Sequence, residues 1–248
     1  MKLYQKYVEG ETNNVYDHIE KIGFEAFSDP YKEEVEKVLE ETFKRVLYNL
    51  KIIYKELVAI GYQFKTEFRF NSEKPFHAPL ANTEVLLKEL GCSVKDFGFV
   101  PLSLKYFYKI VGSVNFTWDY QNHPKLMWQM ADPIEVSSLD DLVKFTDQNW
   151  KTYIQESIDE ESIENGFLEL AADSLHKDNV SGGLPYSIEI PKQPSVDAHF
   201  INEPHGTTFI NYLRICFEHC GFPGMAQQKD NEIYNAFCNK VKPQLKKI

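Results

Sequence analysis

Apolar residues recur every three or four positions after Ser28, which is the spacing of one face of an α-helix. Asp29 can cap this helix, and Pro30 suits its first turn because no hydrogen bond needs the missing N–H there. Gly61 follows the last apolar turn, as glycine often does just beyond a helix end. The pattern predicts one long amphipathic helix over residues 29–60. Its apolar face is formed by Val35, Val38, Leu39, Phe43, Val46, Leu47, Leu50, Ile53, Leu57 and Val58.

Five shorter helices are predicted further along the chain from the same spacing. Pro101 can open the second of them, since proline fits a first turn, and Gly112 can close it. Ser138 is a suitable N-cap for the third helix, and either Thr207 or Thr208 is suitable for the fourth. The five helices are expected at residues 83–91, 101–112, 139–153, 209–221 and 231–241.

Short stretches of alternating or continuous apolar residues predict strands between these helices. The strands are expected at residues 113–116, 126–130, 133–136, 167–171, 186–190 and 198–201. Residues 62–70 alternate at period two and predict either another strand or an extended arm. Gly182 and Gly183 predict a turn with positive φ, which glycine adopts without steric cost.

The composition predicts a chain with a folded core. Of the 248 residues, 43% are apolar and 14% are aromatic, which is more buryable surface than a disordered chain carries. The first residues contain no apolar stretch of signal-peptide length, and no apolar run approaches the roughly 20 residues that span a bilayer. A cytoplasmic location is therefore expected. The four cysteines agree with it, since we expect buried free thiols in place of a disulfide framework.

The charge of the chain disfavours nucleic acids and membranes as partners. There are 27 basic and 37 acidic residues, and a net charge of −10 repels phosphate groups. From Asp132 to Asp173 there are twelve acidic residues and only Lys144 and Lys151 as basic ones, so the whole imbalance lies in this segment. It is either a solvated surface or a face that attracts a basic protein partner. In the second case, the contact residues are Asp140, Asp141, Asp147, Asp159 and Glu160.

Two aromatic residues are expected at the same binding surface. Trp118 and Tyr120 share a polar stretch with Asp119, Gln121 and Asn122. Aromatic side chains in such surroundings often anchor protein interfaces. Together with the acidic residues, they form the predicted partner-binding site.

An alternative ligand site is suggested by a polar loop and two histidines. His199 and His205 each follow a carboxylate residue by two positions, and the loop 177–186 carries several polar side chains. The loop has neither the glycine motif that binds phosphate nor the G-x-S-x-G motif of serine hydrolases, so no catalytic residue is predicted. The alternative site comprises Lys177, Asn179, His199 and His205.

One group of residues has the side chains that bind zinc. Cys216, His219 and Cys220 could share a helix face, with Cys238 as a fourth ligand. The competing interpretation is that the cysteines continue the apolar face of that helix and pack as small hydrophobic residues. The second interpretation is preferred, so no metal and no cofactor are predicted, although the sequence does not settle whether these four residues bind a metal.

A series of short motifs follows residue 84. A short helix ending at Gly91 is followed by Val100-Pro101-Leu102, an aromatic-rich helix, Gly112 and a strand. The later motifs are Ile134-Glu135-Val136-Ser137-Ser138-Leu139, the strand 167–171 followed by Asp173, the strand 186–190, and Phe209 to Leu213. This order resembles the SUKH superfamily over about residues 84–220, a family that includes a yeast regulator of glucan synthesis and many bacterial immunity proteins. The long helix at 29–60 and the loop at 175–185 depart from the family pattern.

The resemblance implies an α+β fold with a central, mostly antiparallel, twisted sheet of about five or six strands and helices packed on it. Residues 1–83 are then an N-terminal helical extension that packs on the core and contains the long helix. Residues 84–248 are a SUKH-like domain with a C-terminal helix. The family shares no catalytic residues, so none is implied here.

The function implied by the resemblance is non-enzymatic protein binding, by an immunity protein that neutralises a basic, nuclease-like toxin. One alternative is a small-ligand-binding protein or enzyme that uses the loop 177–186 with His199 and His205. Another is a scaffold or regulatory protein without a toxin partner. The sequence leaves the identity of the partner, the face that binds it and the oligomeric state open.

Overall fold

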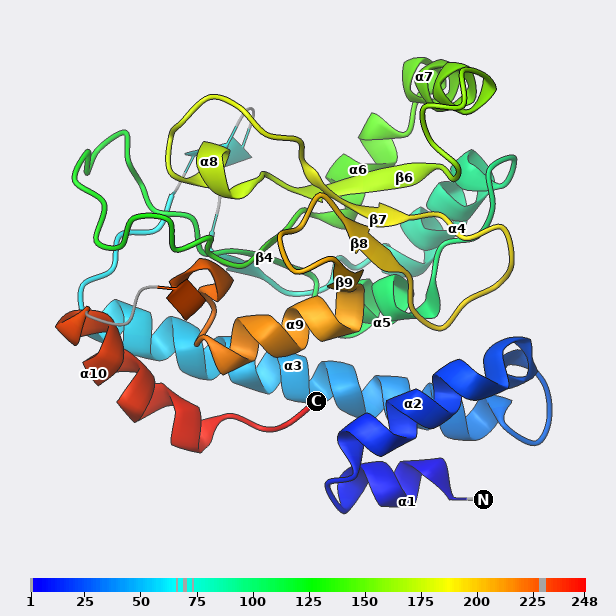
Figure 1. Ribbon diagram of the computed structural model, residues 1–248, viewed down its shortest axis with the longest axis horizontal. Coiled ribbons are helices and arrows are strands. Elements are labelled where there is room, and N and C mark those ends of the chain that lie inside the picture. Colours follow the sequence, from blue (N-terminus) through cyan, green and yellow to red (C-terminus); the bar gives the residue numbers. More distant parts are fainter. Residues whose placement is uncertain (1, 66, 69–70, 73, 228–230) are drawn as a thin grey trace.

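The computed structural model describes residues 2–65, 67–68, 71–72, 74–227 and 231–248 (Figure 1). The chain combines helices with antiparallel strands, as expected. It begins with α1 (Leu3–Val8), α2 (Thr12–Ile22), η1 (Gly23–Phe27) and α3 (Lys32–Ala59). The long helix predicted from the sequence is confirmed as α3. Its apolar series is buried except for Leu47 and Val58.

The two ends of α3 differ in how well the sequence predicts them. Asp29 does not cap the helix, which begins at Lys32 with Tyr31 in the N-cap position and no capping bond from a side chain. Pro30 precedes the helix and follows a cis peptide bond. The C-terminal end is as predicted, because Gly61 lies just beyond the helix with a φ of 77°.

α5 (Leu102–Ile110) and α9 (Phe209–Glu218) form a layer between the strands and α3 (Figure 1). Ring contacts connect these helices. Phe43 of α3 meets Phe107 of α5 with centroids 6.2 Å apart, and Phe107 meets Phe209 of α9 at 5.7 Å. Such edge-to-face pairs stabilise a core beyond the apolar area they bury. Residues of the N-terminal helices and of the later segments share one hydrophobic core.

The described strands form three small antiparallel sheets. One pairs β1 (Glu67–Phe68) with β2 (Asn71–Ser72). A second has the order β3 (Phe76–His77), β4 (Ser113–Asn115), β5 (Glu135–Val136). The third has the order β6 (Phe167–Ala171), β7 (Tyr186–Glu189), β8 (His199–Ile201), β9 (Thr207–Thr208).

The prediction of a single sheet of five or six strands is therefore wrong. β5 and β6 lie next to each other, and Ser137 N–H donates to the Leu170 carbonyl at 2.7 Å. The neighbouring contact is made by a side chain, since Glu135 Oε2 accepts from Ala172 N–H at 3.1 Å. The chain then leaves for α6 (Leu139–Phe145), so no regular ladder joins the sheets. β5 is too short to continue the pairing.

The helix expected at residues 139–153 is divided in two. α6 ends before Thr146, and α7 (Gln148–Asp159) begins two residues later. Asp147 explains the second start, because its Oδ1 accepts the Trp150 N–H at 2.9 Å and so caps α7. The second helix continues as far as Asp159, beyond the predicted end at residue 153.

Two smaller predictions from the sequence are wrong. α4 (Thr83–Val94) continues through Gly91, which does not end it. Residues 126–130 form no strand. Of the predicted stretch 62–70, residues 66, 69 and 70 lie outside the described residues, while Phe64 pairs with Trp118 in an isolated bridge. The remaining helices are α8 (Ser174–Lys177), η2 (Pro223–Gln227), α10 (Glu232–Val241) and η3 (Lys242–Gln244).

All four cysteines are free thiols, and Cys92 is exposed whereas the other three are buried. The expectation of free thiols is confirmed, and the expectation of burial fails for Cys92. None of the helices in the described part of the chain combines the length and the apolar character that crossing a lipid bilayer requires.

Candidate functional site

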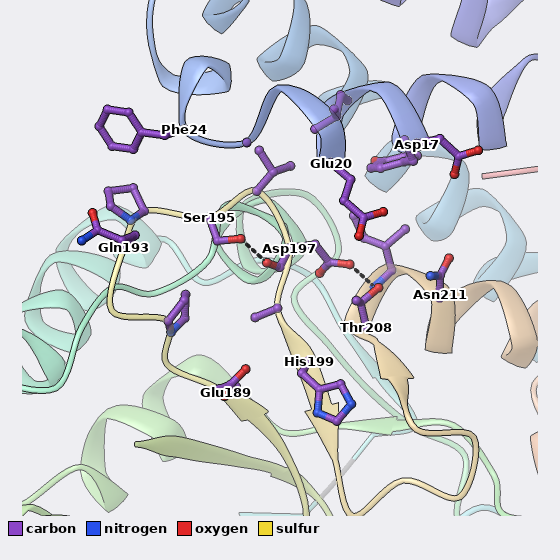
Figure 2. Close-up of a pocket in the computed structure, with 18 of the residues that line it drawn as sticks. Asp17, Glu20, Phe24, Glu189, Gln193, Ser195, Asp197, His199, Thr208 and Asn211 are labelled. Atoms are coloured by element: carbon purple, nitrogen blue, oxygen red, sulfur yellow. Dashed lines mark hydrogen bonds between the residues drawn. The ribbon is translucent and has the colours of Figure 1, made fainter. Parts of the chain in front are cut away.

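A cavity of about 850 Å³ lies between the N-terminal helices and the segment that follows β7 (Figure 2). α2 and η1 form one wall, residues 189–199 form the opposite wall, and the beginning of α9 closes one side. This volume falls within the range of small-molecule pockets, about 300–1,000 Å³. The polar and aromatic lining includes Asp17, Glu20, Phe24, Asp197, His199 and Arg214.

The polar face of α2 supplies the first wall. Val15 and Ile19 are buried, which leaves Asp17 and Glu20 exposed on another part of the helix. These two carboxylates are three residues apart, so they lie on one side of the helix. Glu20 extends from α2 into the space between the walls (Figure 2).

The opposite wall is held in place by α5. The N–H groups of Leu102 and Ser103, at the start of that helix, donate to the carbonyls of Ser195 and Val196 at 3.0 and 2.8 Å. Ser195 also donates its hydroxyl to the main-chain oxygen of Asp197, shown as a dashed line in Figure 2. These bonds give the wall a defined shape without regular secondary structure.

Asp197 lies where this wall meets the first turn of α9. Its Oδ2 accepts the Ile210 N–H at 3.0 Å, and its Oδ1 is buried without a hydrogen-bond partner. Burial raises the pKa of Asp197 above its ordinary value, while Ser103, Thr208 and the N–H groups of Ile210 and Ala198 oppose this shift. The groups that oppose the shift are all neutral donors.

Arg214 is the single cationic residue among the described residues that line the cavity, apart from the titratable His199. Its Nε donates to the main-chain oxygen of Ile248 at 2.9 Å, and its Nη1 donates to Asn211 Oδ1 at 2.8 Å. The guanidinium also lies 4.8 Å from the centroid of the Tyr16 ring. These bonds use two of its five N–H donors, and Nη2 is buried without a partner.

The residues of the predicted ligand site do not come together. His199 lines the cavity and is exposed, whereas His205 pairs with Glu203 in the turn between β8 and β9. Asn179 is exposed in the loop after α8, with a φ of 61°. Neither His205 nor Asn179 is among the cavity residues.

The position of Lys177 contradicts its predicted role in a ligand site. Its side chain is completely buried, and its Nζ lies 2.7 Å from Asp132 Oδ1. Tyr186 donates its hydroxyl to Asp132 Oδ2 at 3.1 Å. A lysine held in this way cannot serve a ligand at the surface. The loop 177–186 was predicted as polar from its sequence, and a buried ion pair anchors its beginning.

Trp118 and Tyr120 are also placed differently from the prediction. Trp118 is buried, packs edge-to-face on Tyr62 and donates its Nε1–H to the carbonyl of His123 at 2.7 Å. Tyr120 is half-buried and accepts from Lys65 Nζ at 3.2 Å. Trp118 is therefore part of the core and does not present its ring to a partner.

The acidic residues lie on α6, on α7 and in the turn that follows α7. Asp140 and Asp141 both pair with Lys144 at 3.1 Å. Asp147 caps α7, while Asp159 and Glu160 are exposed at the other end of the same helix. Three of the five predicted contact residues therefore lie at the two ends of α7, which projects from the body of the protein (Figure 1), and the other two lie on α6.

The described residues contain no group of three or more His, Cys, Asp or Glu side chains arranged to hold a metal ion. Cys216, His219 and Cys220 do belong to α9 and its end, as the sequence suggested. Hydrogen bonding joins the thiols of Cys220 and Cys238, and Cys216 bonds with Tyr212. These partners are ones that packed free cysteines make.

Of the described residues that line the cavity, the site predictions from the sequence include His199 alone. Asp197 entered that prediction only as the carboxylate two positions before His199, and Asp17 and Glu20 belong to no predicted site. The amphipathic pattern of residues 12–22 could have placed both carboxylates on a polar helix face. No local pattern could have shown that this face lies opposite Asp197.

Compared with known proteins, the chain matches no family model, and no curated protein and no solved structure matches it significantly. The resemblance to the SUKH superfamily is neither supported nor opposed by these comparisons and stays a prediction.

Proposed function

We propose that this chain is a non-enzymatic protein-binding domain whose partner is basic. The proposal rests on an acidic surface, defined here as residues 147–164, which comprise the N-cap of α7, the helix itself and the turn after it. All six carboxylates of this surface are exposed, and Lys151 is its one basic residue. The six are Asp147, Glu156, Asp159, Glu160, Glu161 and Glu164.

Two aromatic side chains support a role in binding. Tyr153, on α7, is 55% exposed, and so is Phe145 at the end of α6. Aromatic side chains are enriched in protein interfaces, where polar and charged groups form the rim around them. A basic partner would be attracted by the carboxylates and would bury the rings.

A nuclease toxin is the partner that best fits this surface. A protein that cleaves nucleic acid carries positive charge around its active site, because it must attract phosphates. A projecting row of carboxylates would occupy such a site and exclude the substrate. An immunity protein of this kind would act in the cytoplasm, where the toxin would otherwise reach its target.

The proposal predicts a gene for a secreted toxin with a basic nuclease domain beside the gene for this chain. Expression of that toxin domain in a bacterial host should stop growth, and co-expression of this chain should restore it. The variant Glu156→Lys, Asp159→Lys, Glu160→Lys should bind the toxin domain at least about tenfold more weakly and should fail to protect. It keeps the Asp147 cap, and lysines near a helix C-terminus are tolerated.

The matched control reverses the same number of charges elsewhere. Glu9 is exposed just after α1, and Glu40 and Glu89 are exposed on α3 and α4. The variant Glu9→Lys, Glu40→Lys, Glu89→Lys therefore has the same net charge. It should protect as the wild type does. Absence of protection by the wild type would refute the immunity function and leave a scaffold role. Equal losses of protection in both variants would show that the acidic surface is not the part of the chain that binds the toxin domain.

A further inference from the structure

We propose that the cavity between α2 and residues 189–199 binds an aliphatic organic cation, with a small polyamine as the defining ligand class. The proposal is independent of the acidic surface on α7, because the two regions share no residue.

The first argument is charge. Four carboxylate residues line the cavity, and Arg214 is the one permanently charged cation opposing them among the described lining residues. Within the described part of the chain, no lysine or arginine forms an ion pair with Asp17, Glu20 or Asp197. A concave site with an excess of one sign of charge concentrates counter-ions. The excess negative charge therefore selects a cation.

The second argument is hydrogen bonding. Asp197 Oδ1 is buried without a partner, and an unsatisfied buried acceptor costs about 1–3 kcal/mol. An ammonium group has three donors and no acceptor, so it complements carboxylates and amide oxygens. Phosphate or another anion would instead depend on Arg214 and would meet four carboxylate residues around it. Its Nε and Nη1 already donate within the protein, and its Nη2 has no partner.

The third argument is shape. The carboxylates come from two walls, Asp17 and Glu20 from α2 and Asp197 from the facing segment, so a ligand with separated charges can reach both. Apolar surface toward the other end of the cavity comes from Pro191, Pro194 and from Phe24, which is 64% exposed (Figure 2). Methylene groups that connect ammonium groups would pack on this surface. A compact inorganic cation would leave most of the 850 Å³ unfilled.

The test is calorimetric titration of the full chain with spermidine at about 0.15 M salt, which screens loose association with exposed carboxylates. We expect one molecule to bind per chain. The variant Asp17→Asn, Glu20→Gln should weaken binding about tenfold or more. Both residues are exposed on α2, so the variant should fold. Asp197→Asn should also weaken binding, and circular dichroism would show whether this buried change preserves the fold.

The matched control is Asp159→Asn, Glu160→Gln, which removes two neighbouring charges from the acidic surface and none from the cavity. It should bind spermidine as the wild type does. A short lysine-rich peptide is the second probe, because a protein side chain is the other source of an aliphatic ammonium group. Peptide binding that is lost in the α2 variant would support the cavity as an ammonium site. Failure of both probes to bind, or equal losses in the α2 variant and the control, would overturn the proposal.

Discussion

Lys177 Nζ and Asp132 Oδ1 form an ion pair of 2.7 Å in which both side chains are almost completely buried. The pair joins α8 to the loop before β5, and Asp132 occupies a left-handed conformation there, with a φ of 49°. Tyr186 completes the cluster: its hydroxyl donates to Asp132, and its ring lies 4.6 Å from the ammonium group. Two segments without regular pairing are thus fixed to each other and to β7.

The first prediction follows from this pair. Lys177→Met removes the cation and leaves the Asp132 carboxylate buried without compensation, so the free energy of unfolding should fall by about 3–5 kcal/mol. The double variant Lys177→Met, Asp132→Asn removes both charges and keeps a residue that tolerates positive φ. It should be clearly more stable than the single variant, as measured by urea unfolding. If the two variants are equally unstable, the pair acts through packing and its charge is unimportant.

The second prediction concerns the glycine turn before β7. Gly183 has a φ of 83°, and an added Cβ would overlap the carboxyl group of Asp173. That carboxylate caps α8 by accepting the N–H groups of Leu175 and His176, so it cannot move freely. Gly183→Ala should lower the thermal unfolding temperature more than Gly206→Ala. Gly206 also has positive φ but open space around it, so its substitution should cost only about 1–2 kcal/mol. An equal fall in unfolding temperature in the two variants would show that the Asp173 carboxylate moves to make room for the added Cβ.

The third prediction concerns the last residues of the chain. Asn49 is buried in α3, where its Nδ2 donates to the Lys246 carbonyl and its Oδ1 accepts the Lys246 N–H, both at 2.8 Å. Asn49→Asp keeps an acceptor but loses the donor, at a cost of about 1–3 kcal/mol. Hydrogen exchange at residues 245–248 should then become faster. Asn82→Ala is the control, because Asn82 is exposed and its side chain does not cap α4. Unchanged hydrogen exchange at residues 245–248 in Asn49→Asp would show that Asn49 does not hold the C-terminal residues in place.

The fourth prediction is a pH dependence. Burial lowers the pKa of His219 below 6.5, with Lys242 and His205 acting in the same direction and Glu218 opposing them. As the pH falls below 6.5, the unfolded chain takes up the proton first, so stability decreases until the folded pKa is passed. His219→Gln should therefore lose less stability than the wild type between pH 7.5 and 5.5, as measured by urea unfolding. Parallel losses would show that His219 titrates normally.

Local sequence patterns predict only some features of the candidate cavity. The spacing of Val15, Ile19 and the polar residues between them is enough to predict an amphipathic helix. The spacing does not show what its polar face meets. The burial of Lys177 is hidden in the same way, because a lysine beside Asp178 and Asn179 has the sequence of an exposed loop.

The sequence by itself determined the elements whose formation depends on near neighbours. The 3.6-residue spacing predicted α3, α5 and α9, the apolar stretches predicted β6 and β7, and Gly61 and Gly112 marked two helix ends. Only the tertiary structure decided that short strands divide among separate sheets, that Asp132 reaches Lys177, and that α2 lies opposite Asp197. These outcomes depend on contacts between segments far apart in the chain, and such contacts are selected by the burial of the whole core, which no local spacing encodes.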